Sequence, residues 1–307
     1  MDKDSNIDMS VKLGSTHFSN PVIAASGTFA YGIEFSPFVD LNVLGGFCTK
    51  GLSIKPKIGN RFPRMIETAS GMLNAIGLEN IGLERFVDEK LPYLEKFQAR
   101  LIVNFFGDTI DEYVELANEL SKLPRVDALE MNVSCPNVEK GGVRLSSDPV
   151  ILKEVVESVR KVTKKTLIVK LSPNVKDITE VALAAEEGGA DALSLINTFV
   201  GLKIDVELRK PWLANTTGGV SGPAIKPLAL AMVYETVRSV KIPVIGIGGI
   251  SSVQDALEFF IAGASAIQIG TANYIDPSIT MKVIAGLFDY CKENNLKSLA
   301  ELSSLNR

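Results

Sequence analysis

The chain has 307 residues, of which 46% are hydrophobic and 22% charged, and its formal net charge is −4. This composition is typical of a globular protein and excludes a disordered or fibrous one. The small negative charge argues against nucleic-acid binding, and no apolar run reaches the length of about 18 residues that a membrane span needs. The first residues are polar and acidic, unlike a signal peptide, so we expect a soluble cytoplasmic protein.

Eight short apolar segments recur along the chain, and several are apolar throughout, as parallel strands buried on both faces are. The predicted strands are residues 22–25, 46–49, 101–104, 128–132, 167–171, 192–197, 244–248 and 266–270. Amphipathic segments lie between them and carry helix start and stop residues. The predicted helices are residues 109–123 after Asp108, 149–161 after Asp148, 178–187 after Asp177, and 253–261 after Ser251-Ser252.

Strands that alternate with helices predict an α/β fold, a (β/α)8 TIM barrel that forms a single domain over residues 1–307. An open doubly wound sheet is the alternative, because the number of strands does not prove closure. Two connections, residues 50–101 and 197–244, are longer than a helix and two loops require. We expect them to form extended loops at the C-terminal face of the barrel, as substrate loops or lids.

The predicted strands end in polar residues or glycines, at the face where β/α barrels carry out chemistry. These positions are Ser26, Lys50, Asn104, Asn132, Lys170, Asn197, Gly248-Gly249 and Gly270-Thr271. Buried polar groups are costly unless each is paired, and a polar ligand in the mouth of the barrel would pair them together.

The last two strand ends predict a phosphate site. Gly248-Gly249 leads through Ser251-Ser252 to a helix start, where free amides and the positive end of the helix dipole would meet. Gly270-Thr271 would add further amides, and phosphate sites after strands seven and eight recur in this fold. Two ordinary tight turns are the alternative.

Few side chains remain for the chemistry, because the chain has one histidine, His17, and three scattered cysteines. These exclude a disulfide framework, a four-cysteine metal or iron–sulfur site and a multi-histidine site, so we expect no metal. Cys48 and Cys291 fit the common role of small buried residues. Cys135 instead follows Asn132 in a loop, and a thiol with a pKa of about 8.5 can act as a base toward a carbon acid.

Lys170 and the basic run of residues 50–64 each have more than one possible role on the sequence alone. Lys170 can form a Schiff base, stabilise negative charge on a bound flavin, or make a structural ion pair. Residues 50–64 contain five cations and no acidic residue. That run is expected either to steer a carboxylated substrate, to meet an acidic partner, or to be a solvated loop.

Several motifs together resemble the class 1 dihydroorotate dehydrogenases, flavin enzymes of pyrimidine synthesis, over nearly the whole chain. They are Thr49-Lys50-Gly51, Asn74-Ala75-Ile76-Gly77-Leu78-Glu79-Asn80, Asn132-Val133-Ser134-Cys135-Pro136-Asn137, Lys170-Leu171-Ser172-Pro173, Ile196-Asn197-Thr198, Gly218-Gly219-Val220-Ser221-Gly222-Pro223, Gly248-Gly249 and Gly270-Thr271-Ala272.

The resemblance implies an FMN-binding barrel that oxidises (S)-dihydroorotate to orotate, with Cys135 as the base that removes the C5 proton. The implied substrate-binding residues are Lys50, Asn74, Ala75, Ile76, Gly77, Leu78, Asn132, Asn197 and Thr198. The implied FMN-binding residues are Ser26, Lys50, Gly51, Asn104, Asn132, Lys170, Ile196, Gly222, Gly248, Gly249, Gly270 and Thr271, the last four at the phosphate.

Residues 74–78 and 135–142 are most similar to subclass 1B. That resemblance implies a heterotetramer with a second subunit, which carries FAD and a [2Fe–2S] cluster and passes electrons to NAD⁺. Three scattered cysteines cannot hold that cluster, so it would lie on the partner. The fumarate-reducing subclass 1A homodimer shares most of these residues and is the alternative.

Other classes of protein remain possible on the residues alone. An α-hydroxyacid oxidase needs a histidine at the mouth, whereas His17 precedes the first barrel strand. A Schiff-base lyase would use Lys170, and a non-catalytic protein would only bind a phosphate-bearing ligand.

Overall fold

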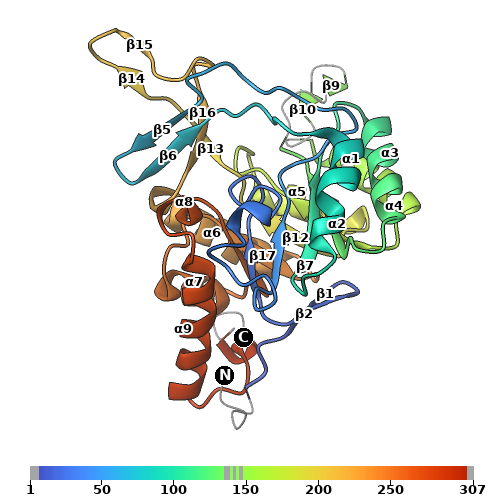
Figure 1. Cartoon of the computed structure of the whole chain (residues 1–307), viewed down its shortest axis with the longest axis vertical. Helices are drawn as coiled ribbons and strands as arrows, with labels where there is room; N and C mark the ends of the chain where they lie inside the picture. The colour runs from blue at the N-terminus through green and yellow to red at the C-terminus, as the bar shows by residue number, and fades with distance from the viewer. Residues whose placement is uncertain (1–6, 135–138, 141–142, 145–147, 303–307) are drawn as a thin grey trace.

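A closed barrel of eight parallel strands forms the centre of the molecule in the computed structural model, which describes residues 7–134, 139–140, 143–144 and 148–302 (Figure 1). Its strands are β3 (Val22–Ala24), β4 (Gly46–Cys48), β7 (Arg100–Phe105), β8 (Ala128–Asn132), β11 (Thr166–Lys170), β12 (Ala192–Leu195), β17 (Val244–Ile247) and β18 (Ala266–Ile269). Strand β18 pairs with β3 and closes the sheet, which confirms the barrel and excludes the open sheet. Six of the strands end one or two residues earlier than the sequence predicts, because the chain turns away at the mouth.

Helices cover the outside of the barrel (Figure 1). They are α3 (Ile110–Ser121), α4 (Pro149–Val162), α5 (Ile178–Glu187), α6 (Lys226–Ser239), α7 (Val253–Ile261) and α9 (Ile279–Glu293). The four predicted helices are confirmed, although α4 ends one residue later than predicted and α3 starts one residue later and ends two residues earlier. Thr109 is its N-cap rather than its first residue, since the Thr109 hydroxyl accepts from the Glu112 amide at 3.2 Å. No helix in the described ranges is long and apolar enough to cross a membrane.

Shorter elements complete the structure. They are α1 (Gly82–Arg85), the π-helical turn Phe86–Lys90, α2 (Leu91–Leu94), α8 (Ala272–Ile275), the 3₁₀ turns Ile33–Phe35, Pro223–Ile225 and Leu299–Leu302, and the strand pair β9 (Glu139–Lys140) and β10 (Val143–Arg144).

The two long connections meet in a second sheet. Strands β5 (Met65–Thr68) and β6 (Gly71–Asn74) come from the first connection, and β13 (Phe199–Gly201) and β16 (Gly218–Ser221) from the second. They form an antiparallel sheet in the order β13–β16–β6–β5. The hairpin of β14 (Ile204–Asp205) and β15 (Lys210–Pro211) extends beyond it, away from the barrel (Figure 1). The two extended connections therefore contain short strands that pair with each other, a feature that the sequence does not predict.

The N-terminal half of the barrel interior is apolar. Each barrel strand contributes one fully buried side chain to this layer: Ile23, Cys48, Ile102, Ala128, Ile168, Ala192, Ile245 and Ala266. A hairpin of β1 (Val11–Leu13) and β2 (Thr16–Phe18) packs Leu13 and Phe18 against the layer and closes this end. Because side chains alternate along a strand, residues two positions further on face the same interior, nearer the mouth.

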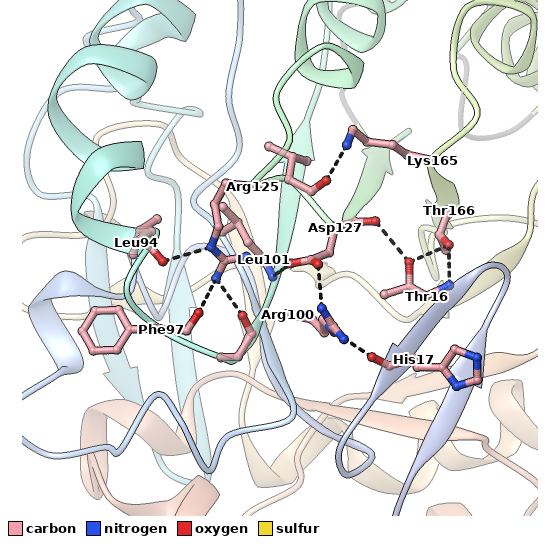
Figure 2. A network of polar contacts seen from close by, with 12 residues as sticks. Thr16, His17, Leu94, Phe97, Arg100, Leu101, Arg125, Asp127, Lys165 and Thr166 are labelled. Atoms are coloured by element: carbon pink, nitrogen blue, oxygen red, sulfur yellow. Dashed lines mark hydrogen bonds and ion pairs between the residues drawn. The ribbon is translucent and has the colours of Figure 1, made fainter.

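Charged residues fasten this closed end (Figure 2). Asp127, just before β8, accepts from Arg125 at 2.6 Å and from Arg100 at 3.0 Å. Arg100 also donates to the carbonyl of His17 in β2 at 2.7 Å. The network thus ties the hairpin to the starts of two barrel strands.

Replacing Phe18 with alanine should lower the free energy of unfolding by about 3–5 kcal/mol, because a cavity would replace a buried ring against the apolar layer. Urea denaturation followed by circular dichroism measures the change. Phe38, which is 58% exposed, is the control, and Phe38→Ala should change stability by less than about 0.5 kcal/mol. Equal stability of the two variants would show that the hairpin does not seal the barrel.

Candidate active site

A polar layer lies above the apolar one in the barrel interior. It consists of Asn104, Glu130, Lys170, Ser194 and Gln268, each two positions after a member of the apolar layer and each buried. Asn104 and Lys170 are expected site residues, whereas sequence reasoning missed the other three. The signal was present, because all three are polar residues inside predicted strands, on the face that the alternation assigns to the interior.

Glu130 is the centre of this layer. Its carboxylate is fully buried and accepts from Asn104 Nδ2 at 2.7 Å, from Ser194 Oγ at 2.9 Å and from Gln268 Nε2 at 2.6 Å. The ammonium of Lys170 lies 3.8 Å from the carboxylate. A buried charge is tolerated when it is paired and hydrogen-bonded, and Glu130 meets both conditions.

Lys170 retains hydrogen-bonding capacity. Its side chain is 7% exposed, and Ser26 Oγ, at 3.1 Å, is the one acceptor within hydrogen-bond distance of Nζ in the described part of the chain. An ammonium group has three N–H donors. Two therefore remain for a ligand, and a buried donor left without a partner costs free energy. The structure thus brings Ser26 and Lys170 together around a position that suits an acceptor.

Asn104 offers an acceptor, its side-chain oxygen, whereas Lys170 offers donors. Its Nδ2 is used by Glu130, so Oδ1 is the atom left for other partners. A Cβ atom at Gly51 would lie 2.9 Å from this oxygen, closer than packing permits. Glycine is therefore needed at 51 for the chain to pass so near Asn104.

The predicted asparagines after β8 and β12 form one group. Asn132 Oδ1 accepts from the Ser134 amide at 3.1 Å and from Asn197 Nδ2 at 3.4 Å. Asn197 Oδ1 accepts from the Thr198 amide at 2.9 Å. The group presents amide and hydroxyl functions at the carboxyl ends of β8 and β12, the two neighbours of β11 in the barrel, which suits a ligand with several polar ring atoms.

Residues 74–78 lie at the end of β6 and are held by a different set of contacts. Asn74 donates to the Gly219 carbonyl at 3.4 Å. The carbonyl of Ala75 accepts from Asn60 Nδ2 at 3.0 Å, and that of Ile76 from the Asn60 amide at 2.9 Å. No hydrogen bond between described residues joins 75–78 directly to the strand-end asparagines. The structure therefore places this predicted substrate segment on the second sheet rather than on the barrel itself.

The glycine turns after β17 and β18 leave amides free. Among the described residues, no backbone carbonyl accepts a hydrogen bond from the amides of Gly248, Gly249, Gly270 or Thr271. Gly249 has φ of 72°, and a Cβ there would lie 2.7 Å from Lys226 Cβ. Free amides in such turns bind anions, which fits the predicted phosphate site.

Other predicted cofactor contacts lie beside these turns. The Thr271 hydroxyl is 2.8 Å from that of Ser221, and a Cβ at Gly222 would lie 2.7 Å from the Cα of Gly71. Ile196 packs beside Gly248, with its Cγ1 3.5 Å from the position of a Cβ there. The second sheet and the last strands thus meet at this part of the mouth.

The start of α7, which the sequence predicts as part of the phosphate site, carries capping contacts of its own. The Ser252 hydroxyl accepts from the Asp255 amide at 3.1 Å, and the Asp255 carboxylate accepts from the Ser251 amide at 3.0 Å. Burial opposes ionisation of Asp255, but hydrogen bonds from Lys226, Ser251 and Ser252 leave its pKa below the usual value. Side chains of the chain itself therefore satisfy one amide of the first turn of α7 and one amide just before it, and place a negative charge there.

The basic run of residues 50–64 is largely paired with acids from elsewhere. Lys57 lies 2.6 Å from Asp108, while Lys50 and Arg64 both contact Glu79. Exposed pairs of this kind contribute at most about 1 kcal/mol each. The run is consequently not a free cationic patch.

The three cysteines divide as follows. Cys135, the expected base, lies outside the described residues, with its neighbours 136–138. Cys48 and Cys291 are buried free thiols. Burial, followed by the negative charge of Glu130, raises the pKa of the Cys48 thiol well above its usual value, and burial also raises the pKa of Cys291. Neither of these two thiols is suited to act as a base at neutral pH.

A cavity of about 450 Å³ at the opposite end of the barrel does not form a competing site. It is lined by Ser19, Asn42, Gly45, Glu95, Phe97, Gln98, Arg100, Pro124, Arg125 and Asp127. The guanidinium of Arg125 already donates to the carbonyls of Leu94, Phe97 and Ala99 and to Asp127 (Figure 2). Its donors serve the fold, so the free donors at the mouth mark the better candidate.

Residues 8–290 match the family model described as dihydroorotate dehydrogenase. The chain belongs to the dihydroorotate dehydrogenase family. It is 55% identical over 297 residues to the "Dihydroorotate dehydrogenase B (NAD(+)), catalytic subunit" of Trichlorobacter lovleyi, with 97% of both chains covered. Proteins of the same name from Geobacter sulfurreducens and Parabacteroides distasonis are 53% and 52% identical, over 96% of this chain and 97% of theirs.

The solved structure of the family member from Eimeria tenella in complex with ferulenol has the same fold. It superposes with a TM-score of 0.76 at 22% identity, over 98% of this chain and 89% of that one. Flavin is the cofactor that the family suggests, and the free donors of the mouth are consistent with one.

Gly249→Ala should weaken FMN binding at least tenfold, because the added Cβ would collide with Lys226 and move the amides of the turn. Fluorescence titration of the apoprotein with FMN measures the dissociation constant. Gly14→Ala is the matched control: it has a φ of 56° and a Cβ contact of 2.8 Å to Asp191, but lies at the closed end. If both variants bind FMN like the unmodified protein, the turn after β17 is not a phosphate site.

Proposed function

We propose that this chain is the catalytic subunit of an NAD⁺-linked dihydroorotate dehydrogenase, which oxidises (S)-dihydroorotate to orotate in pyrimidine synthesis. The observation that carries the proposal is the similarity of 52–55% over nearly the full length to proteins with that name. The proposal includes a single FMN-binding domain over residues 1–307. It also includes a cytoplasmic location, which the buried free thiols of Cys48 and Cys291 support.

FMN is the flavin that we assign to the mouth of the barrel. Its phosphate suits the free amides of Gly248, Gly249, Gly270 and Thr271. The spare donors of Lys170 and the free oxygen of Asn104 suit the polar edge of a flavin ring. The remaining proposed contacts are Ser26, Lys50, Gly51, Asn132, Ile196 and Gly222. When bound, FMN supplies the hydride acceptor.

The substrate would be held by the asparagine group. Side-chain amides of Asn74, Asn132 and Asn197 and the hydroxyl of Thr198 can bind a carboxylate and the ring amides of a dihydropyrimidine. Lys50 adds a cation, with residues 75–78 alongside. These contacts orient the substrate so that its C6 hydrogen faces the flavin and its C5 hydrogen faces a base.

Cys135 is the proposed base. It follows Asn132 by three residues, so the strand that anchors a substrate contact also leads to the thiol. Its thiolate would take the C5 proton while the C6 hydrogen leaves as hydride toward the flavin, and the electron pair of the broken C5–H bond would form the C5=C6 double bond, so the substrate gains no net charge.

A second subunit completes the proposed electron path. The relatives' names contain "catalytic subunit" and "NAD(+)", which favours a partner over the fumarate-reducing homodimer. We assign FAD and a [2Fe–2S] cluster to that partner, in a heterotetramer. Cys48 and Cys291 lie buried in separate elements, β4 and α9, which is unsuited to binding a cluster.

Cys135→Ala should bind FMN and orotate as the unmodified chain does but reduce its flavin at least a hundredfold more slowly with dihydroorotate, since a general base typically contributes about 10²–10⁴-fold. Anaerobic stopped-flow absorbance measures the rate. Cys135→Ser should be impaired less and require higher pH, because a hydroxyl is a much weaker acid than a thiol. Unchanged flavin reduction by the alanine variant at neutral pH would exclude Cys135 as the base.

A further inference from the structure

The buried carboxylate of Glu130 has no assigned part in the chemistry. Burying an ion pair costs about as much as the attraction returns, so the Glu130–Lys170 pair adds little net stability over an apolar interior. The three hydrogen bonds and the ion pair described above, however, join Glu130 to Asn104, Ser194, Gln268 and Lys170, all in the polar layer of the barrel interior. The Glu130 carboxylate is therefore expected to affect the ligand that binds at the mouth of the barrel.

We propose that Glu130 is a positioning residue that sets the charge and the hydrogen-bond polarity of the flavin floor. It offsets the positive charge of Lys170 and holds the Asn104 amide with Oδ1 directed away from the carboxylate. This inference rests on the proposed function, since it assumes that a flavin lies above Lys170 and Asn104.

Glu130 interacts with Lys170 through its charge and not through a hydrogen bond. At 3.8 Å, the carboxylate is close enough to compensate the ammonium charge but too far for a direct hydrogen bond. Lys170 therefore keeps N–H donors for a ligand while its field is reduced. Removing the carboxylate charge would leave a nearly buried cation uncompensated beneath the flavin.

The orientation of two amides follows from the same carboxylate. An ionised carboxylate accepts hydrogen bonds and cannot donate, so Asn104 and Gln268 must both turn their nitrogen atoms toward it. Gln268 Oε1 is buried without a hydrogen-bond partner among the described residues. The amide is thus oriented by the hydrogen bond from its nitrogen to Glu130, although its oxygen is left without a donor. Asn104 Oδ1 is left as an acceptor in the same way, next to Gly51.

Glu130→Gln tests the proposal, because it keeps the size of the side chain and removes the charge. Reduction adds negative charge to a flavin, so an uncompensated Lys170 should favour the reduced form. At a fixed potential, the ratio of reduced to oxidised FMN should rise at least tenfold, which is a shift of about +30 mV for a two-electron couple. Spectroelectrochemical titration of the FMN-loaded protein measures this ratio.

Ser194→Ala is the matched control, since it removes one hydrogen bond to Glu130 and leaves the charge in place. Its ratio should stay within about 1.5-fold of the unmodified protein, below the smallest change expected of either Glu130 variant. If Glu130→Gln does not fold, Glu130→Asp provides the test. Its side chain is one methylene group shorter, so the carboxylate lies further from Lys170, and the ratio of reduced to oxidised FMN should rise two- to fivefold.

The outcomes separate the inference from the proposed function. An unmodified chain that binds no FMN would overturn the proposed function, and the inference with it. A normal FMN complex whose potential is the same in the unmodified protein, Glu130→Gln and Glu130→Asp would overturn the inference alone. Loss of stability in Glu130→Gln with no change in potential would likewise assign Glu130 a purely structural role.

Discussion

The hydrogen-bonded carboxylate of Glu130 is the interaction on which the mouth of the barrel depends. A closed parallel barrel directs every second side chain of eight strands into one interior, and that interior must be filled. Here the lower layer is filled by apolar side chains, and the upper layer contains the polar side chains of Asn104, Glu130, Lys170, Ser194 and Gln268. The upper layer is stable because Glu130 accepts from three neighbours and faces a cation. The floor of the mouth is thus rigid and polar at once.

The second sheet extends the site beyond the barrel. Strands β6 and β16 belong to different connections, yet Gly219 pairs with Asn74 across the sheet. A hydroxyl contact between Thr271 and Ser221 links that sheet to the end of β18. Asn74, the proposed substrate residue that lies in β6, is therefore held by backbone pairing, and its position depends on the second connection as much as on the first.

The sequence reveals the repeating part of this architecture and most of the mouth. Apolar runs predict all eight strands, and the residues that follow them predict Ser26, Lys170, Asn132 and Asn197 as neighbours. The second sheet was not foreseen, because pairing between segments about 145 residues apart leaves no local pattern. The acids that neutralise residues 50–64 were missed for the same reason, since Glu79 and Asp108 lie outside the run.

Two features had local signals that were not used. Ser252 and Asp255 have the spacing of a capping box, which predicts that the start of α7 satisfies its own amides. The alternation of side chains places Glu130 on the same face as Ala128 and Asn132, and therefore inside the barrel. Polar residues within the predicted strands thus indicate the polar layer inside the barrel, just as the polar residues at the strand ends indicate the mouth.

The cationic side chains at the two ends of the barrel differ in whether their hydrogen-bond donors are used within the protein or remain for a ligand. At the closed end, the donors of Arg125 are consumed by three carbonyls and a carboxylate (Figure 2). At the mouth, Lys170 is at least as buried but, within the part of the chain that the structure describes, keeps two of its donors, and the amides of two glycine turns have no backbone acceptor there. Of the residues that carry these donors, Lys170 and Gly248 are buried, and a buried donor without a partner costs free energy. A ligand that satisfies them recovers that free energy on binding, which is why the unsatisfied end, and not the more highly charged one, is where the chemistry is expected.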